Sequence, residues 1–166
     1  MTSPFLHLLE LALKESDLSA VRDLVRRSLG AEKRTLEVGC GPGIFADLFA
    51  TGDYVGVDPR IRFVDYARRH RPGAFICDEL LAVGLPAARF DQGLGLDVLG
   101  PRSDAAGRAI AAEIKRLLVP GGRVLLVERA KSGGRVERLA AGVGRLERRD
   151  PVKSGMRERV AFLLST

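Results

Sequence analysis

The sequence predicts an α/β fold in which a mostly parallel sheet is covered by helices. Short apolar runs alternate with segments of helical periodicity, as in chains built from βαβ units. The first of these runs leads directly into closely spaced glycines at 39–43, and the second run, 54–57, is followed by Asp58. Acids and glycines at strand ends are typical of the ligand-binding edge of such sheets.

The elements follow in order along the chain. Residues 4–29 predict two helices, which Pro4 begins and Gly30 ends. After the first strand and its glycines, Ile44, Phe45 and Leu48 have the spacing of a further helix. The later strands are expected at 54–57, 74–77, 90–99 and 123–128, with helices at 61–71 and 103–118 and two more apolar stretches at 144–152 and 160–164.

Length and composition set the limits of the prediction. A chain of 166 residues fits one domain, which we divide into N-terminal helices at 1–30 and a core at 34–166. No apolar run approaches the ~18 residues of a membrane span. The only cysteines are Cys40 and Cys77, which predicts no disulfide framework and a cytoplasmic location. The two histidines are far apart, so we expect no metal site.

The glycine segment discriminates between cofactors. A dinucleotide site needs G-x-G-x-x-G, but the third glycine here is Gly43 and position 44 is isoleucine. Glu37 stands two residues before Gly39, where a carboxylate would repel a pyrophosphate and attract an ammonium group. The pattern therefore favours a ligand with an ammonium group and no phosphate.

Two segments carry a resemblance to a known family. Residues 36–43, Leu-Glu-Val-Gly-Cys-Gly-Pro-Gly, closely resemble the first motif of class I S-adenosylmethionine-dependent methyltransferases. Residues 118–125 are similar to the proline-glycine-glycine motif that precedes the family's fifth strand. The resemblance implies S-adenosylmethionine as cofactor, S-adenosylhomocysteine as product, and a single three-layer domain. It also implies a seven-stranded sheet that ends in an antiparallel strand pair, and N-terminal helices that often lie over the cofactor.

Acids at two strand ends are the further cofactor candidates. Asp58 can accept both hydroxyls of a ribose, although it could also cap the next helix. The resemblance implies that Asp78 accepts the adenine amino group and that Glu79 and Leu80 contact the adenine ring. Asp78 could also be a simple turn residue. The full set of expected cofactor-binding residues is Glu37, Gly39, Cys40, Gly41, Gly43, Asp58, Pro59, Asp78, Glu79, Leu80, Gly95 and Leu96.

The fourth strand should face the methyl acceptor. Its glycines, Gly93 and Gly95, suggest close approach of a ligand or another backbone. Asp97 is the candidate catalytic residue, which would orient or deprotonate the acceptor, although it could also be a loop cap. Many relatives carry a histidine shortly after this strand, where this chain has Gly100 and Pro101.

The resulting prediction is a methyltransferase acting on a small-molecule acceptor. Methylation of RNA ribose, with Asp97 and Lys131, is one alternative, and a non-catalytic cofactor-binding subunit that needs a partner chain is another. The net charge is −2 over residues 1–100 and +8 over 101–166, in accord with +6 for the chain. The basic half makes nucleic acid a possible partner, against the simpler interpretation of a solvated arginine-rich surface.

Overall fold

The computed structural model describes residues 18–155 and 157–166 and contains a seven-stranded sheet with the order β3-β2-β1-β4-β5-β7-β6. The first five strands are parallel, β7 is antiparallel to β5, and β6 is antiparallel to β7. This confirms the predicted fold class. The strands are β1 Thr35–Val38, β2 Tyr54–Val57, β3 Ala74–Ile76, β4 Phe90–Leu96, β5 Leu118–Arg129, β6 Arg145–Ser154 and β7 Arg157–Ser165.

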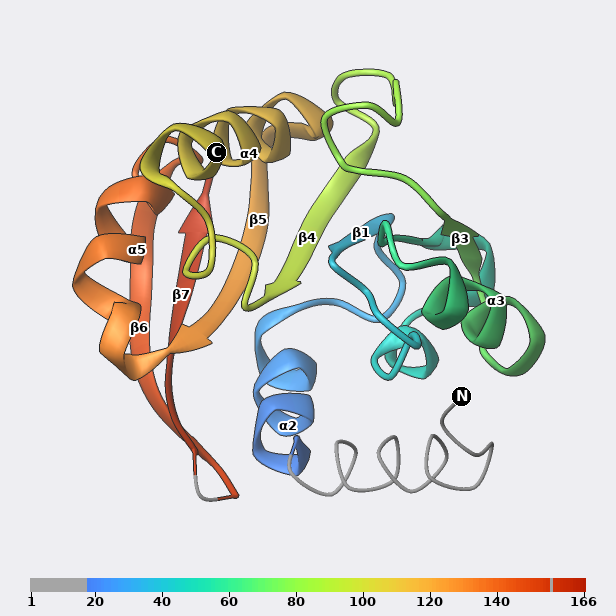
Figure 1. Ribbon diagram of the computed structural model, residues 1–166, viewed down its shortest axis with the longest axis horizontal. Helices are drawn as coiled ribbons and strands as arrows, with labels where there is room; N and C mark the ends of the chain where they lie inside the picture. The colour runs from blue at the N-terminus through green and yellow to red at the C-terminus, as the bar shows by residue number, and fades with distance from the viewer. Residues whose placement is uncertain (1–17, 156) are drawn as a thin grey trace.

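Helices cover both faces of the sheet (Figure 1). In the buried strand β5, Val124 and Leu126 face one core cluster, while Leu125 and Val127 face the other, as the period of a strand requires. The first cluster holds the apolar sides of α4, Asp104–Leu117, and α5, Gly133–Ala140. The second holds those of α2, Ser19–Ser28, and α3, Ile61–His70.

The strand order places the ligand-binding edge. β1 lies between β2 and β4, so the connections leave β1 in opposite directions and open a crevice beyond its carboxyl end. β7 runs the other way, so its first residues lie at this same edge. In the register of the two strands, Arg159 of β7 stands opposite Arg129 at the end of β5. The edge therefore collects the ends of the first five strands and the start of the seventh.

The prediction of a helix after the glycine segment is wrong. That connection holds only two short 3-10 turns, Ala46–Leu48 and Thr51–Asp53. The N–H of Ala50 donates to the carbonyl of Ala31, at 2.9 Å, instead of continuing a helical ladder. Phe45 and Phe49 are buried against the second core cluster, so their spacing reflects packing rather than helical hydrogen bonding.

The other elements differ in detail. β4 ends at Leu96 rather than 99, and β5 begins at Leu118 because the Pro-Gly-Gly turn is continuous with the strand. Gly121 in that turn has φ +76°, which suits glycine. The second N-terminal helix is confirmed as α2, whereas the first lies outside the described residues. None of the described helices has the length and apolar character needed to cross a bilayer.

The glycines of β4 make room for side chains. A Cβ on Gly93 would approach Val124 to 3.1 Å, and one on Gly95 would lie 2.9 Å from Val98 and 3.0 Å from Leu126. The close approach that these glycines predicted is thus made by neighbouring side chains of the protein core.

Candidate functional site

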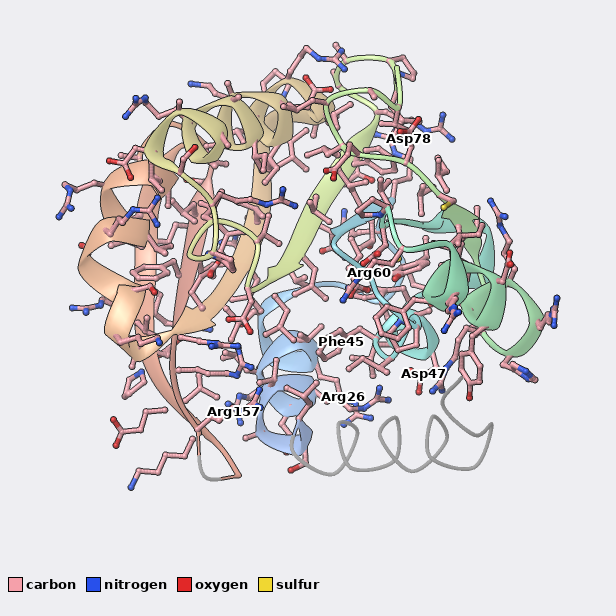
Figure 2. The ribbon with its side chains drawn as sticks, viewed as in Figure 1. Arg26, Phe45, Asp47, Arg60, Asp78 and Arg157 are labelled. Carbon is pink, nitrogen blue, oxygen red and sulfur yellow. The ribbon has the colours of Figure 1, made fainter. Side chains whose placement is uncertain are left out.

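Two adjoining pockets lie at the carboxyl edge of the sheet. One has a volume of about 470 Å³ and the other about 510 Å³, and both are lined by Gly39, Arg60, Leu96 and Asp97. The first, here called the loop pocket, adjoins the glycine segment and the starts of β7 and α2; the second, the acid pocket, adjoins the ends of β2 and β3. Figure 2 labels Arg60 and Phe45 on the glycine-loop side and Arg157 on the side of the β6–β7 hairpin.

The glycine segment forms a turn that side chains would not permit. Gly39, Gly41 and Gly43 have φ of +70°, +53° and +71°, in the left-handed region. A Cβ on Gly43 would stand 2.8 Å from the ring of Phe75. The Gly41 N–H donates to Oδ2 of Asp58 at 2.9 Å, which ties the turn to the end of β2. The loop is therefore fixed by its own conformation and by one buried carboxylate.

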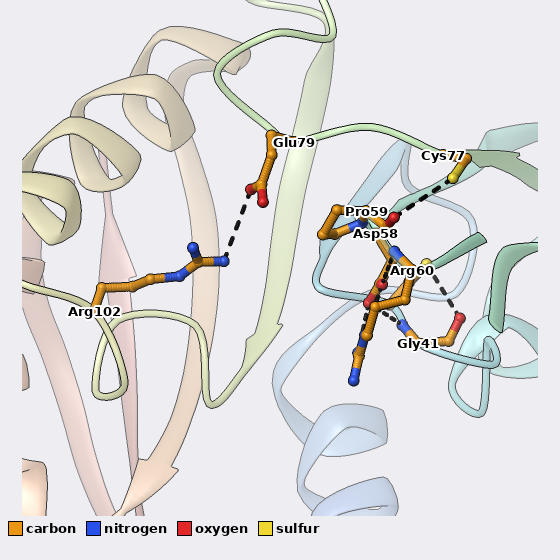
Figure 3. A network of polar contacts seen from close by, with 8 residues as sticks. Gly41, Asp58, Pro59, Arg60, Cys77, Glu79 and Arg102 are labelled. Carbon is orange, nitrogen blue, oxygen red and sulfur yellow. Dashed lines mark hydrogen bonds and ion pairs between the residues drawn. The ribbon is translucent and has the colours of Figure 1, made fainter. Parts of the chain in front are cut away.

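Asp58 is buried and fully engaged by protein donors (Figure 3). Oδ1 accepts from the backbone N–H and Nε of Arg60, both at 2.9 Å, and Oδ2 accepts from Nη2 of Arg60 at 2.7 Å. Burial acts to raise the pKa of Asp58, but the bonds from Arg60 and Gly41 outweigh it and hold that pKa below its ordinary value. Asp58 is thus an ionised acceptor at the floor of the acid pocket.

Glu37 is buried beneath the glycine segment. It is 1% exposed and accepts a hydrogen bond from the hydroxyl of Tyr54. Burial raises the pKa of Glu37 to about 8, opposed by the Tyr54 bond and reinforced by the charge of Asp58. A ligand ammonium group in the loop pocket would favour the ionised form. Glu37 lies beside the glycine segment, as the sequence predicted. With a pKa of about 8, it is mostly a neutral acid at pH 7.

The acid pocket combines carboxylates with an apolar wall. Asp78 follows β3, and its Oδ1 accepts from the N–H of Glu79 at 2.8 Å, as a turn residue would. Glu79 lies 3.8 Å from Nη2 of Arg102, which reaches it from the loop before α4 (Figure 3). Leu80 and Ile110 are among the apolar residues that line the pocket. An apolar wall with acids at its rim suits a flat ring that bears an amino group.

Asp97 stands at the end of β4 among arginines. It has φ +53°, a conformation that is uncommon outside glycine. Its Oδ1 accepts from Nη1 of Arg159 at 2.9 Å, and its Oδ2 lies 3.9 Å from Nε of Arg129. The carboxylate thereby links the ends of β4 and β5 to the start of β7.

The loop after Asp97 is held by a second buried carboxylate. Glu128, near the end of β5, is 0% exposed and accepts backbone N–H groups of Val98, Leu99 and Gly100 at 2.9, 2.8 and 3.1 Å. Burial raises the pKa of Glu128, while these three donors favour its charged form. Glu128 fixes the backbone that follows Asp97.

Most of the predicted site residues meet at the two pockets. The described pocket linings include Asp97 and every expected cofactor residue except Gly43 and Gly95, both of which pack against side chains. Lys131, named for the RNA alternative, is not among the described residues of either lining. The lining residues that the sequence analysis missed include Phe45, Phe63, Arg60, Arg129, Arg157 and Arg159.

Comparisons with known proteins agree with this geometry. Residues 35–122, which are more than half of the chain, match a protein family described as "Methyltransferase domain". No curated protein matches the sequence. The structure resembles the PH0226 protein of Pyrococcus horikoshii, with TM-score 0.77 and 17% identity over 91% of this chain and 90% of that one.

Two other solved structures are similar over nearly the whole chain. A TehB-like S-adenosylmethionine-dependent methyltransferase of Corynebacterium glutamicum has TM-score 0.72 and 22% identity, covering 96% of this chain and 98% of that one. The 1,6-didemethyltoxoflavin-N1-methyltransferase of Burkholderia thailandensis, solved with that substrate and S-adenosylhomocysteine, has TM-score 0.75 and 15% identity, covering 100% and 91%. At these identities the likeness shows the fold.

The chain belongs to the methyltransferase-domain family, and its fold is that of the class I S-adenosylmethionine-dependent methyltransferases. The reaction class of this family is methyl transfer.

Proposed function

We propose that the acid pocket binds the adenosine part of the cofactor and that the loop pocket holds its methionine part and the acceptor. The observation that carries this proposal is the convergence of Asp58, Asp78 and the Gly39–Gly41 turn on two connected pockets. Asp58 would accept the ribose hydroxyls, Asp78 the adenine amino group, and Glu37 the ammonium group. The glycines would let the cofactor approach the backbone closely.

The adenosine part of the cofactor would fit the acid pocket after one rearrangement. Asp58 already accepts from Arg60 and Gly41, so a ribose would compete with the Arg60 guanidinium for the carboxylate oxygens. The Arg60 side chain is 58% exposed and can leave without opening the core. Arg60 lines both pockets, so its displacement would also open space between them.

A small molecule is the acceptor that the loop pocket supports. The pocket holds roughly 470 Å³ and has an apolar side made by Leu18, Phe45, Phe63 and Leu96. That size and character match ordinary small-molecule sites. The C-terminal arginines give less support to nucleic acid, because Arg123, Arg135, Arg148 and Arg149 lie in ion pairs with acids of the chain.

The protein's part in the reaction is binding and positioning. S-adenosylmethionine supplies an activated methyl group on a sulfonium, so orientation and exclusion of water can provide much of the rate enhancement. Asp97 lines both pockets and would take the acceptor's proton directly, or would orient the acceptor through the arginines with which it pairs. A cytoplasmic setting remains the prediction, supported by free Cys40 and Cys77.

Calorimetry and a transfer assay test the proposal. Titration with S-adenosylhomocysteine should show binding, and NAD should show none. Labelled S-adenosylmethionine with pooled metabolites, and separately with bulk RNA, should give label transfer to the metabolites. NAD binding without a response to S-adenosylhomocysteine would refute the cofactor placement. Cofactor binding without transfer to either pool would favour the non-catalytic subunit, and transfer to RNA would favour the RNA alternative.

A further inference from the structure

Three arginines lie on one side of the loop pocket, and the proposed cofactor contacts do not use them. Arg129 ends β5, and Arg157 and Arg159 begin β7, two residues apart and therefore on the same face of the strand. All three line the pocket. Because β7 is antiparallel to β5, the sheet itself brings these residues to the ligand-binding edge.

Arg159 is a buried cation that the protein satisfies only in part. Its side chain is 4% exposed, and Nη1 donates to Asp97. Its Nε is buried and has no hydrogen-bond partner among the described residues. A buried guanidinium with an unused donor carries a desolvation penalty that an anionic ligand would offset.

The charges of the pocket are out of balance. Among the residues that the structure describes, Asp97 is the only carboxylate paired with this cluster of three arginines, and Arg157 makes no ion pair. Arg60, the fourth arginine of the lining, is held by Asp58. Glu37, the other acid in the described part of the lining, has a pKa of about 8 and is mostly neutral at pH 7. The cluster formed by Arg129, Arg157 and Arg159 therefore has a surplus of positive charge.

We infer that the methyl acceptor carries an anionic oxygen group, a carboxylate or a phosphate, which Arg157 and Arg159 bind together with Arg129. This inference rests on the proposed function. Guanidinium groups match both anions in planar, paired hydrogen bonds. The apolar lining by Phe45, Phe63 and Leu96 adds that the anion belongs to an apolar or aromatic body.

The competing ligand for the arginines is the cofactor's own carboxylate. β1, which carries Glu37, is separated from β7 by β4 and β5. Three strand spacings put Arg159 roughly 14 Å along the sheet from Glu37. The arginines thus approach the pocket from the side away from the cofactor's expected amino-acid end, which favours the acceptor as their ligand.

Binding of simple probes tests the inference without the acceptor. Benzoate and phenyl phosphate are titrated into the protein, alone and with saturating S-adenosylhomocysteine, beside neutral benzyl alcohol. We expect each anion to bind about tenfold or more tightly than benzyl alcohol. Arg157→Gln and Arg129→Gln should each lower the affinity for the two anions by roughly three- to tenfold and leave the affinity for benzyl alcohol unchanged. Equal binding of anions and benzyl alcohol would overturn the inference.

A matched control lies on the same strand. Arg123 lies in the middle of β5, outside the lining of the loop pocket, and is 56% exposed, close to the 52% of Arg129, so Arg123→Gln should leave anion binding unchanged. Equal losses in Arg123→Gln and Arg129→Gln would show a nonspecific charge effect and refute a site. Arg159→Lys keeps the buried charge but removes the paired hydrogen bonds of the guanidinium, so it should also lower the affinity for the anions.

A second pair of ligands separates acceptor from cofactor. S-adenosylhomocysteine has an amino-acid end, and methylthioadenosine lacks it. If the arginines serve the acceptor, Arg157→Gln binds both within about twofold of wild type. Loss of S-adenosylhomocysteine affinity alone would assign the cluster to the cofactor's carboxylate and overturn the inference. Failure of wild type to bind either nucleoside would instead refute the proposed function, while the anion titrations stand by themselves.

Discussion

The two sides of the candidate site differ in charge. Strands β2 and β3 are each followed by an acid at the ligand-binding edge, and these two residues, Asp58 and Asp78, line the acid pocket. On the other side, β5 ends and β7 begins with the arginine cluster of the loop pocket. Acids accept from hydroxyl and amino groups, whereas guanidinium groups donate to anions. One sheet edge can therefore hold two ligands of opposite polarity side by side.

The largest expected effect comes from Glu128, which holds the loop between the two sides. Glu128→Ala would leave two buried N–H groups and one part-buried N–H group without their acceptor, so we expect the free energy of unfolding to fall by about 3–5 kcal/mol. Urea denaturation measures this loss. Glu113→Ala, which removes only a surface pair with Arg116, should cost less than about 1 kcal/mol. Equal losses would mean that Glu128 does not fix the loop.

The next effect concerns the acid side alone. Asp58→Asn removes the charge that should accept the ribose hydroxyls, so S-adenosylhomocysteine affinity should fall by about 10- to 100-fold in calorimetry. Anion binding to the arginine cluster should not change. Asp91→Asn is the matched control. Asp91 also accepts two hydrogen bonds from one arginine side chain, that of Arg34, but it lies away from both pockets. Unchanged cofactor affinity in Asp58→Asn would place the ribose elsewhere.

A pH-dependent effect is expected for Glu37. The unfolded chain releases this proton near pH 4.5, and the folded chain keeps it up to about pH 8. The residue's contribution to stability is therefore full below pH 4.5 and is lost as the pH rises toward 8. Glu37→Gln keeps an acceptor for the Tyr54 hydroxyl and cannot ionise. Relative to wild type, this variant should gain about 3–4 kcal/mol between pH 5 and pH 8 in urea denaturation. A constant difference across this range would contradict the raised pKa.

The acid side was predictable from sequence because its signals are local. A strand followed by glycines, and an aspartate directly after the next strand, place Gly39 and Asp58 without knowledge of the rest of the fold. The same local reasoning failed for Ile44 and Phe49, where burial between α2 and the sheet produces helical spacing without a helix.

The basic side depended on the direction of a distant strand. The sequence indicated an apolar stretch at 160–164 and left Arg157 and Arg159 outside it, as part of a charged surface. Only the antiparallel pairing of β7 with β5 brings Arg159 to Asp97, far away in sequence, and places Arg157 in the lining of the same pocket. Their spacing of two before a buried strand was the available signal. It indicated a shared strand face but not the edge at which that face begins.

The smallest expected effect is at Arg60, the arginine that lies between the two sides. In the structure its guanidinium occupies the Asp58 oxygens that a ribose would need, so cofactor binding includes the loss of that ion pair. Arg60→Ala leaves Asp58 with the N–H of Gly41 and the backbone N–H of residue 60. We expect S-adenosylhomocysteine to bind about two- to fivefold more tightly, because binding no longer has to break the ion pair, whose net free energy is small where the arginine is 58% exposed.

Arg62→Ala, on the first turn of α3, provides the control for Arg60 and should leave calorimetric affinity at the wild-type value. The direction of the Arg60→Ala effect decides between two arrangements of the site. Tighter binding means that Arg60 competes with the ribose and shields Asp58 until the cofactor arrives. Weaker binding would mean that the guanidinium itself contacts the cofactor, and the positive side of the site would then extend to the end of β2. In that case the end of β2 would belong to both sides, and the division into an acidic and a basic side would hold only for the ends of the other strands.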